Sequence, residues 1–415
     1  MASNFFSVSF ALIPTNVAIS YDIFINSSAL KTREHFIRIS QSGDTLTKGD
    51  LHKFKMKYHQ IYVAENQRAI FLKSACSMKG APDEKKTTVL KESAIHHLKT
   101  LFENKQELTT EVLSHTIEGC RDVVDGMVNI LGSYSIEKLQ DLIARLSFHD
   151  FYTYDHSVNV AMYCILIYKA IFPYASHEEI LQAGLGGLLH DLGKIKIPTH
   201  IINNAGKLSM KEFCEIKKHP VYGCELLKQP NLYVSENINL QLLNRVVMEH
   251  HENWDGTGYP KQLREDQIHI LSRITAVADF FDAVTTKRSY HEPISTEDAI
   301  ALMSHSQGKK LDPDLFLLFT EHIQKWKAAE HAQKHQDVEL APDFDPCQPH
   351  KELPLISSEK TSVKNGEDQQ TSFGTVQVIK GENEMYHPHP FGKIHIIDPT
   401  KNKKNAPRKA LKKTA

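Results

Sequence analysis

Two pairs of adjacent polar residues carry the clearest chemical signal in this chain. His190-Asp191 is followed by Leu192-Gly193-Lys194, and His250-His251 opens the stretch that runs to Pro260. Imidazole and carboxylate groups suit divalent iron, manganese or zinc, and a bound metal ion makes hydroxide from water near neutral pH. One His-Asp pair occurs by chance in many proteins. Two pairs with further histidines and an aspartate around them favour a metal centre.

Seven residues in the central part of the chain are candidate metal ligands: His156, His190, Asp191, His219, His250, His251 and Asp279. Each histidine alone is more often a surface or core residue than a ligand. The repetition of these groups on successive helices favours one shared site. Seven ligands exceed the four of a tetrahedral zinc site. Two ions bridged by Asp191 and a hydroxide would use them all, an arrangement suited to phosphoester hydrolysis.

The apolar periodicity predicts that helices position these groups. His156 lies early in a predicted helix, and His219 precedes Pro220, which places it at a helix junction. Gly193 is expected to let the backbone turn sharply after the first pair. Asp279 lies in mid-helix beside an apolar run, where metal coordination would offset the cost of burying a carboxylate. The predicted helices cover residues 151–172, 178–189, 209–214, 238–251, 271–286 and 296–303, and another begins at residue 135.

Composition along the chain predicts a multidomain protein. Short strands at 5–13, 17–25, 36–39 and 60–63, with one helix at 47–58, indicate a small α+β N-terminal domain over residues 1–80. A helical linker is expected over 85–145 and an all-α helical bundle over 146–329. No alternation of strands and helices appears in this part, which excludes a parallel α/β fold.

The C-terminal residues 330–415 read as a polar, largely disordered tail. Residues 375–379 and 393–397 are either isolated short strands or have no regular structure. The last seventeen residues carry seven Lys or Arg and no acidic residue. This basic segment is read as a solvated tail, and the alternative is nonspecific contact with an anionic nucleotide, RNA or lipid.

Bulk properties narrow the class of protein. The formal net charge of −1 gives the whole chain no attraction to nucleic acid or membranes. The six cysteines are scattered without a C-x-x-C pair, which argues against a disulfide framework and fits a reducing cytoplasm. No secretory signal is evident, and the apolar run 158–172 is too short and too polar to span a bilayer. A cytoplasmic protein without a transmembrane segment is therefore expected.

The motifs together resemble a known family, the HD-GYP domains. The resemblance rests on the segments His190 to Lys194, His250 to Glu252, Asp255 to Pro260 and Asp279 to Ala283, with Arg288-Ser289-Tyr290 extending it. It covers roughly residues 145–325. The His-Asp pair alone would indicate only the wider HD phosphohydrolase superfamily. The N-terminal stretch is also similar to a small domain that often precedes HD-GYP domains in bacteria.

The resemblance implies an all-helical domain with a centre of two or three metal ions, commonly iron or manganese. All seven candidate ligands match ligand positions of the family. Asp191 and Lys194 would be catalytic, with Lys194 touching the scissile phosphate. Tyr259 matches the tyrosine of the Gly-Tyr-Pro motif, and Arg288 matches an arginine that contacts substrate phosphate. Without the resemblance, Lys194 would be interpreted as an exposed lysine, the segment around Tyr259 as a tight turn and Arg288 as a surface arginine.

Two positions depart from the family pattern, and one further acid has an open role. Tyr152 stands where members with three metals have a ligand glutamate, so two metal ions are expected. His291 stands where a second basic residue is usual, which would weaken phosphate binding without removing the chemistry. Asp282 either orients a ligand histidine or is a structural hydrogen-bond acceptor.

The resemblance implies a bacterial phosphodiesterase that opens cyclic di-GMP to pGpG, with GMP as a further product to test. A hydroxide bridging the two metal ions would attack phosphorus. One alternative is a catalytically weak cyclic di-GMP receptor that signals by protein contact, and another is an HD hydrolase of a different nucleotide. A diguanylate cyclase, another signalling protein or a second copy of the chain are candidate partners.

Overall fold

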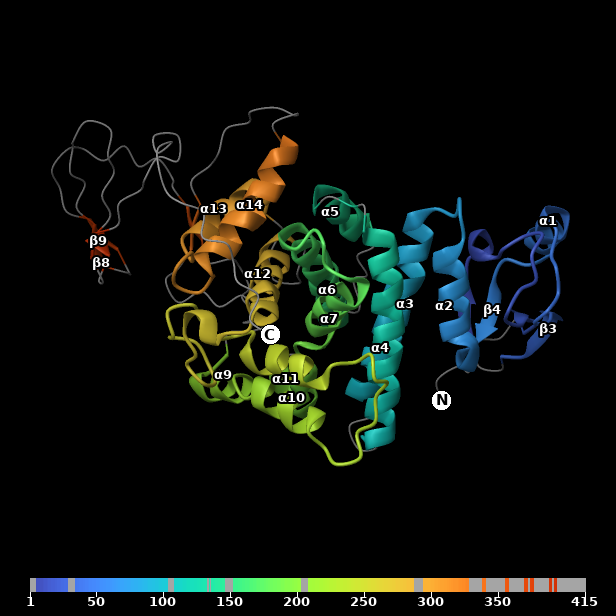
Figure 1. Cartoon of the computed structure of the whole chain (residues 1–415), viewed down its shortest axis with the longest axis horizontal. Coiled ribbons are helices and arrows are strands. Elements are labelled where there is room, and N and C mark those ends of the chain that lie inside the picture. Colours follow the sequence, from blue (N-terminus) through green and yellow to red (C-terminus); the bar gives the residue numbers. More distant parts are fainter. Residues whose placement is uncertain are drawn as a thin grey trace. The chain divides into compact units, whose positions relative to one another are not determined.

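The protein is mostly helical, with a small antiparallel sheet near the N-terminus (Figure 1). The computed structural model describes residues 5–28, 34–103, 108–132, 134, 136–145, 152–202, 208–286 and 294–327. It also describes short strands at residues 338–340, 355–357, 369–371, 374–376, 388–389 and 392–393. Residues 1–356 and 357–415 form two separate units.

The N-terminal sheet has four strands in the order β1-β4-β2-β3. Their bounds are β1 (Phe5–Val8), β2 (Ile23–Asn26), β3 (Phe36–Ser40) and β4 (Ile61–Ala64). Alternate residues of β1, β2 and β4 are buried, as expected for a sheet with one covered face. Helix α2 (Arg68–Ser77) lies on that face, where Phe71 makes an edge contact with Phe6.

The sequence predicted these strands in the right order, but β1 and β2 are shorter than predicted. A turn region separates them, with the 3-10 helix η1 (Phe10–Leu12) and an isolated bridge from Ala18 to Thr45. The predicted helix is α1 (Lys48–Lys57), which begins after a capping box between Thr47 and Asp50. The sequence analysis did not predict α2, because its polar residues interrupt the apolar periodicity.

Two long helices connect the sheet to the rest of the first unit. They are α3 (Asp83–Glu103) and α4 (Thr110–Leu131), which pack against each other and against α6 (Tyr152–Ile171) and α7 (His177–Leu189). Gly184 of α7 allows this close packing, because a Cβ there would lie 2.7 Å from Val124 and 2.8 Å from Ile165. The segment predicted as a linker thus contributes α3 and α4 to the same apolar core as α6 and α7.

Most of the remaining helices follow the predicted ranges closely. They are α5 (Ile136–Arg145), α9 (Met210–Ile216), α11 (Leu240–Glu249), α12 (Ile270–Thr285) and α13 (Thr296–Ser304). Structure beyond those ranges comprises η4 (Leu192–Lys196), α8 (Thr199–Ile202), α10 (His219–Leu227) and α14 (Pro313–Lys327). Helix α6 packs on α7 and α12, and α11 packs on α7 and α10. Helix α10 also contacts η4, which follows α7, so α7, α10 and α11 lie near one another (Figure 1).

Little of the C-terminal segment lies within the described residues. In the second unit, β7 (Gln369–Thr371) pairs antiparallel with β8 (Gly374–Val376), and β9 (Pro388–His389) pairs with β10 (Gly392–Lys393). The predicted strands at 375–379 and 393–397 overlap β8 and β10 only in part. The basic residues from Lys401 onward lie outside the described residues, so the prediction of a disordered basic tail stays a prediction.

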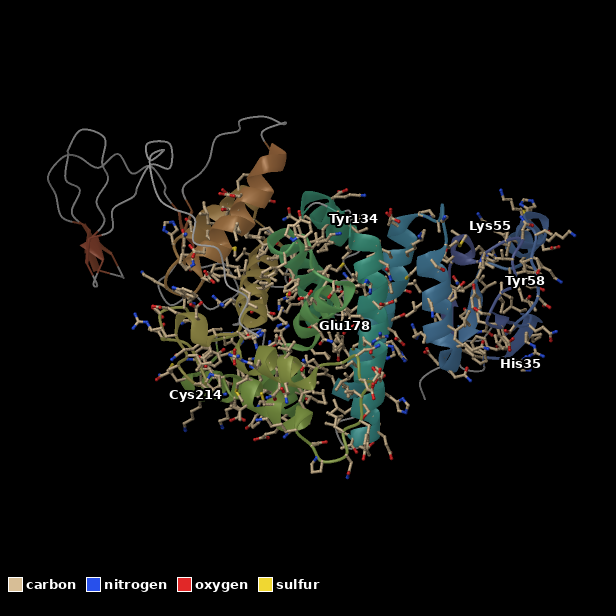
Figure 2. All side chains as sticks on the ribbon, viewed as in Figure 1. His35, Lys55, Tyr58, Tyr134, Glu178 and Cys214 are labelled. Atoms are coloured by element: carbon tan, nitrogen blue, oxygen red, sulfur yellow. The ribbon has the colours of Figure 1, made fainter. Side chains whose placement is uncertain are left out.

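Two further observations concern the described ranges. None of the helices found there has both the length and the apolar character needed to cross a lipid bilayer. Five cysteines in these ranges are free thiols, and Cys214 is exposed on α9 (Figure 2).

Candidate metal centre

Helix ends carry most of the candidate ligands, as the sequence predicted. His190 is the C-terminal cap of α7 and Asp191 follows it, while His250 is the C-terminal cap of α11. His219 is the first residue of α10, which begins three residues after α9 ends. Proline at the first turn of a helix lacks only an N–H that has no partner within the helix, so Pro220 opens α10 without cost.

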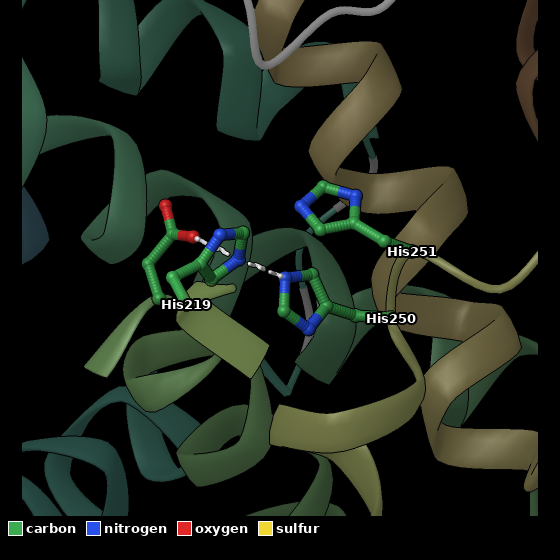
Figure 3. Close-up of side chains that lie close together, drawn as sticks. His219, His250 and His251 are labelled. Carbon is green, nitrogen blue, oxygen red and sulfur yellow. Dashed lines mark hydrogen bonds and ion pairs between the residues drawn. The ribbon is translucent and has the colours of Figure 1, made fainter. Parts of the chain in front are cut away.

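The seven candidate ligands form two buried groups. In each group the ligand atoms lie within 4.8 Å of one another, and the groups are Asp191, His219, His250, His251 and His156, His190, Asp279. Asp191 joins them, because its Oδ2 lies 3.2 Å from His190 Nε2. Figure 3 shows His219 and His250 facing each other, with His251 beside them. The structure therefore brings together all seven residues from five separate helical segments.

Hydrogen bonds fix the tautomers of three of the histidines. The Nδ1 atoms of His190, His219 and His250 donate to the carbonyl oxygens of Gly187, Ile216 and Val247, at 2.7, 2.8 and 3.0 Å. A carbonyl oxygen only accepts, so each Nδ1 carries the proton and each Nε2 keeps a lone pair.

The lone pairs converge on one place. His219 Nε2 lies 3.1 Å from His250 Nε2 and 3.3 Å from Asp191 Oδ1. Since both imidazole protons are on the Nδ1 atoms, no proton lies between the two Nε2 atoms. Within the described ranges, His190 Nε2 and Asp191 Oδ1 make no hydrogen bond. The lone pairs of these Nε2 atoms and the Asp191 carboxylate repel one another at such short distances unless a cation lies among them. The set of donor atoms therefore fits a divalent metal ion.

The protonation states also fit metal binding. Burial lowers the pKa of His219 to about 4, and burial and neighbouring imidazoles hold the pKa values of His250 and His251 well below the usual range. Burial by itself would raise the pKa of Asp191, but neighbouring positive charge, including the Lys194 ammonium group 2.6 Å away, outweighs it and lowers that pKa strongly. Neutral imidazoles and an ionised carboxylate are the forms that coordinate metals.

His156 is held differently from the other ligands. Its Nδ1 lies 2.7 Å from Asp282 Oδ2, and its Nε2 lies 3.0 Å from Asp279 Oδ1. Burial would lower the pKa of His156, but its hydrogen bonds to the two aspartates raise it to about 9. Asp282 also accepts from Asn159 Nδ2 at 2.9 Å and from Thr286 Oγ1 at 2.7 Å, so its carboxylate is fixed. It therefore orients the His156 ring, and a metal ion would replace the proton between His156 and Asp279.

Gly193 allows α10 to lie close to the His190-Asp191 motif. The sequence analysis expected this glycine to permit a sharp turn, and the structure shows a different reason. A Cβ at this position would lie 1.9 Å from the carbonyl oxygen of His219 and 2.4 Å from the amide nitrogen of Gly223. Its φ is not in the left-handed region, so close approach, rather than a special turn, requires glycine here. The contact places His219 next to Asp191.

We expect Gly193→Ala to destabilise the protein by about 1–3 kcal/mol, because the added methyl group meets backbone atoms that must move. It should also weaken Mn²⁺ binding by displacing His219. Thermal unfolding and a manganese titration measure the two effects. Gly49→Ala is the matched control, since a Cβ there lies at an ordinary 3.5 Å from Thr47 Oγ1. An unchanged unfolding temperature for the Gly193 variant would contradict this account of the glycine.

A structured loop carries Tyr259 to the edge of the metal groups. The Glu252 carboxylate accepts from the amides of Lys261 at 2.6 Å and Leu263 at 3.0 Å, which closes the loop. A Cβ at Gly258 would lie 2.1 Å from the Asn253 amide nitrogen, so only glycine fits. The Tyr259 ring stacks on His251 with centroids 4.8 Å apart.

Two lysines lie near this edge. Lys194 Nζ is 2.6 Å from Asp191 Oδ2, and its side chain is 15% exposed, so the ammonium group is at the boundary between the buried ligands and solvent. Lys217 Nζ lies 4.9 Å from the centre of the Tyr259 ring. Arg288, His291 and the Tyr152 side chain lie outside the described part of the structure.

The sequence analysis missed several residues that build the site. They are Asn159, Lys217, Glu252 and the ion pair of Lys91 with Asp155. Asn159 follows His156 by three residues, so helical spacing could have indicated it. Glu252 was noted only as part of a motif. Nothing local indicates the contact between Lys91 and Asp155, which come from different helices.

Comparisons with known proteins also indicate a metal-dependent hydrolase domain in this part of the chain. Residues 175–315 match the family described as the HD domain. The chain is 36% identical over 167 residues to a 3'3'-cGAMP-specific phosphodiesterase of Vibrio cholerae, covering 40% of this chain and 31% of that protein. It is 36% identical over 184 residues to a cyclic di-GMP phosphodiesterase of Pseudomonas aeruginosa, covering 44% and 42%.

The chain therefore spans less than half the length of these curated relatives. Among solved structures, an HDG"Y"P protein from Bdellovibrio bacteriovorus is similar at 17% identity and a TM-score of 0.47, covering 77% of this chain and 99% of that chain. The segment that matches the HD domain, residues 175–315, contains both His pairs and the Gly-Tyr-Pro loop. Residues 175–315 thus match the HD domain, and over part of its length the chain is similar to curated cyclic dinucleotide phosphodiesterases.

Proposed function

We propose that the protein is a metal-dependent phosphodiesterase that hydrolyses cyclic di-GMP. The observation that carries the proposal is the convergence of buried, unprotonated Nε2 atoms on Asp191. A site of this kind is costly to build for stability alone, because buried carboxylates and lone pairs without a cation destabilise the fold.

The two groups of ligands would hold one metal ion each. Asp191, His219, His250 and His251 form the first metal position, and His156, His190 and Asp279 form the second. Asp191 contacts both groups, so it is the candidate bridging ligand. Mixed imidazole and carboxylate donors suit iron, manganese or zinc, and the resemblance to HD-GYP domains favours iron or manganese among these. When bound, the ions would activate water and neutralise charge on the phosphate.

The surrounding residues would bind and orient the substrate. The Lys194 ammonium group is partly exposed beside Asp191, where a phosphate oxygen would approach, and it adds positive charge there. Tyr259 offers its ring at the same edge, held by its stack on His251. Arg288 remains a proposed phosphate-binding residue from the sequence alone.

A second substrate follows from one specific comparison. The relative named as a 3'3'-cGAMP-specific phosphodiesterase has the same 36% identity to this chain as the one named for cyclic di-GMP. The percentage of identical residues therefore does not decide which of the two cyclic dinucleotides is the substrate. Both present phosphodiester groups to the same metal centre, and only their bases differ.

The full chain, loaded anaerobically with Fe²⁺ or Mn²⁺, is expected to turn over cyclic di-GMP to pGpG. Parallel reactions with 3'3'-cGAMP, followed by chromatography of the products, rank the two substrates and show whether GMP forms. Turnover of 3'3'-cGAMP alone would replace the proposed substrate. Binding of cyclic di-GMP without turnover under both metals would identify a receptor and contradict the proposed enzyme.

A further inference from the structure

Lys217 is a half-buried lysine at the edge of the metal groups. It is the C-terminal cap of α9, and its Nζ lies 4.6 Å from the centre of the Phe213 ring and 4.9 Å from the centre of the Tyr259 ring. The Tyr259 ring in turn stacks on the candidate ligand His251. The Lys217 ammonium group and a candidate metal ligand therefore contact the same aromatic ring.

The backbone holds Lys217 beside the first metal position. Its amide nitrogen donates to the Phe213 carbonyl oxygen at 3.0 Å, and the carbonyl oxygen of the preceding Ile216 accepts from His219 Nδ1 at 2.8 Å. The same short segment thus carries the candidate ligand His219 and the lysine two residues before it. Aromatic rings attract a cation through their electron-rich faces without removing its charge, so Phe213 and Tyr259 hold the ammonium group in place.

The charge of Lys217 is partnered differently from the charges of other lysines near the site. Lys194 Nζ lies 2.6 Å from Asp191 Oδ2, and the Nζ of the adjacent Lys218 lies 2.6 Å from Glu215 Oε2. Lys217 Nζ contacts the aromatic rings instead, and no carboxylate oxygen of the described residues lies within 4.0 Å of it. An ammonium group that is half-buried and not paired with a carboxylate can donate to an anionic oxygen of a ligand.

The proposed substrate has two phosphates, whereas the metal centre would act on one at a time. In a cyclic dinucleotide both phosphates belong to the same small ring, so the second phosphate stays near the centre while the first is hydrolysed. Lys194 lies beside Asp191 and would contact the first phosphate. Lys217 lies beside Tyr259 at the edge of the same site, where it offers a positive charge to the second phosphate.

We propose that Lys217 binds the phosphate of a cyclic dinucleotide that is not being hydrolysed. The inference rests on the proposed function. The ammonium group donates a charge-assisted hydrogen bond to an oxygen of that phosphate, and the rings of Phe213 and Tyr259 position it. Lys217 therefore favours substrates with two phosphates over substrates with one.

The test compares two kinds of substrate with the full chain loaded anaerobically with Mn²⁺. One is whichever of cyclic di-GMP and 3'3'-cGAMP the wild type hydrolyses faster, and the other is bis(p-nitrophenyl) phosphate, which has a single phosphate. Lys217→Met keeps most of the length of the side chain and removes its charge. Its KM for the cyclic dinucleotide should rise about 10- to 100-fold, the range for a hydrogen bond between charged groups. Its kcat should change little, because the contact is present before and during the reaction.

The same variant should hydrolyse bis(p-nitrophenyl) phosphate with the kcat and KM of wild type, since this substrate has no second phosphate. Lys218→Met is the matched control, because Lys218 is one residue nearer to His219 and its ammonium group is paired with Glu215. It should leave both substrates unaffected. Lys217→Arg keeps the charge, so its KM for the cyclic dinucleotide should stay closer to wild type than that of Lys217→Met. Lys217→Gln should raise this KM in the same way if the methionine variant fails to fold.

The outcomes separate this inference from the proposed function. Wild-type protein that hydrolyses none of these substrates would overturn the proposed phosphodiesterase, and the inference with it. Wild-type turnover combined with an unchanged KM for the cyclic dinucleotide in Lys217→Met and Lys217→Gln would overturn the role of Lys217 alone. An equal loss of activity on both kinds of substrate, or a lower metal content per chain, would show that Lys217 acts through the metal centre or the fold, and it would also overturn the inference.

Discussion

Replacing Asp191 by alanine is expected to lower the turnover of cyclic di-GMP at least about 10³-fold, because metal ions contribute several kcal/mol to transition-state stabilisation and each 1.36 kcal/mol changes the rate tenfold. Asp191 contacts both groups, at 3.2 Å from His190 Nε2 and 3.3 Å from His219 Nε2. Its loss should therefore weaken both metal positions. Steady-state rates and metal content per chain measure the two effects.

Asp314→Ala is the matched control for this variant. Asp314 is an exposed aspartate in the first turn of α14, away from the candidate ligands, so its loss should leave rate and metal content unchanged. Asp191→Ala also removes the partner of Lys194, which is 2.6 Å away. Turnover within tenfold of wild type in an Asp191 variant would rule out the proposed centre.

Removal of the metal ions is expected to abolish turnover and to lower the unfolding temperature. An ion present at 1,000 times its Kd stabilises the folded state by about 4 kcal/mol per site. For a folded region of this size each kcal/mol changes Tm by roughly 2–4 °C, so loss of one such ion lowers Tm by about 8–16 °C. The physical cause is the loss of the interactions between the ions and the buried imidazoles and carboxylates that would hold them.

The measurement is thermal unfolding of the full chain before and after treatment with a chelator, followed by the return of one metal at a time. Fe²⁺ or Mn²⁺ should restore both Tm and turnover. Mg²⁺ should restore neither, since it prefers oxygen ligands and five of the seven candidate ligands are imidazoles. The Asp191→Ala variant serves as the internal control, because its Tm should respond less to the chelator. A chelated wild-type protein with unchanged Tm would contradict the proposed site.

The sequence alone predicted the places where the candidate ligands occur on helices. Local spacing placed His190 at the end of α7, His219 at a helix junction and His250 at the end of α11, as the structure has them. These predictions succeed because helix periodicity and helix ends are determined by neighbouring residues. The motifs also indicated the HD domain, since they combine several residue types at fixed distances.

Helix α10 shows where local patterns fail. It was not predicted, because Pro220 indicated only a helix junction at His219. In the structure Pro220 lies in the first turn, where it is tolerated, and a Cβ at Gly223 would lie 2.4 Å from Val247 Cγ1 of α11. The glycine is therefore set by contact with another helix. The extent of β2 was wrong for a related reason, since strand limits depend on the neighbouring strands.

Only the tertiary structure decided how the ligands meet and which residues hold them. The sequence left Asp282 as either a partner of a histidine or a structural acceptor, and the fold places its carboxylate 2.7 Å from His156 Nδ1. The pairing of Lys91 with Asp155 joins two helices and has no local signature. Such contacts depend on how whole helices pack, and that packing is fixed by the shape and burial of many distant side chains together. The sequence thus determined the chemistry available to this protein, while long-range packing determined where that chemistry is assembled.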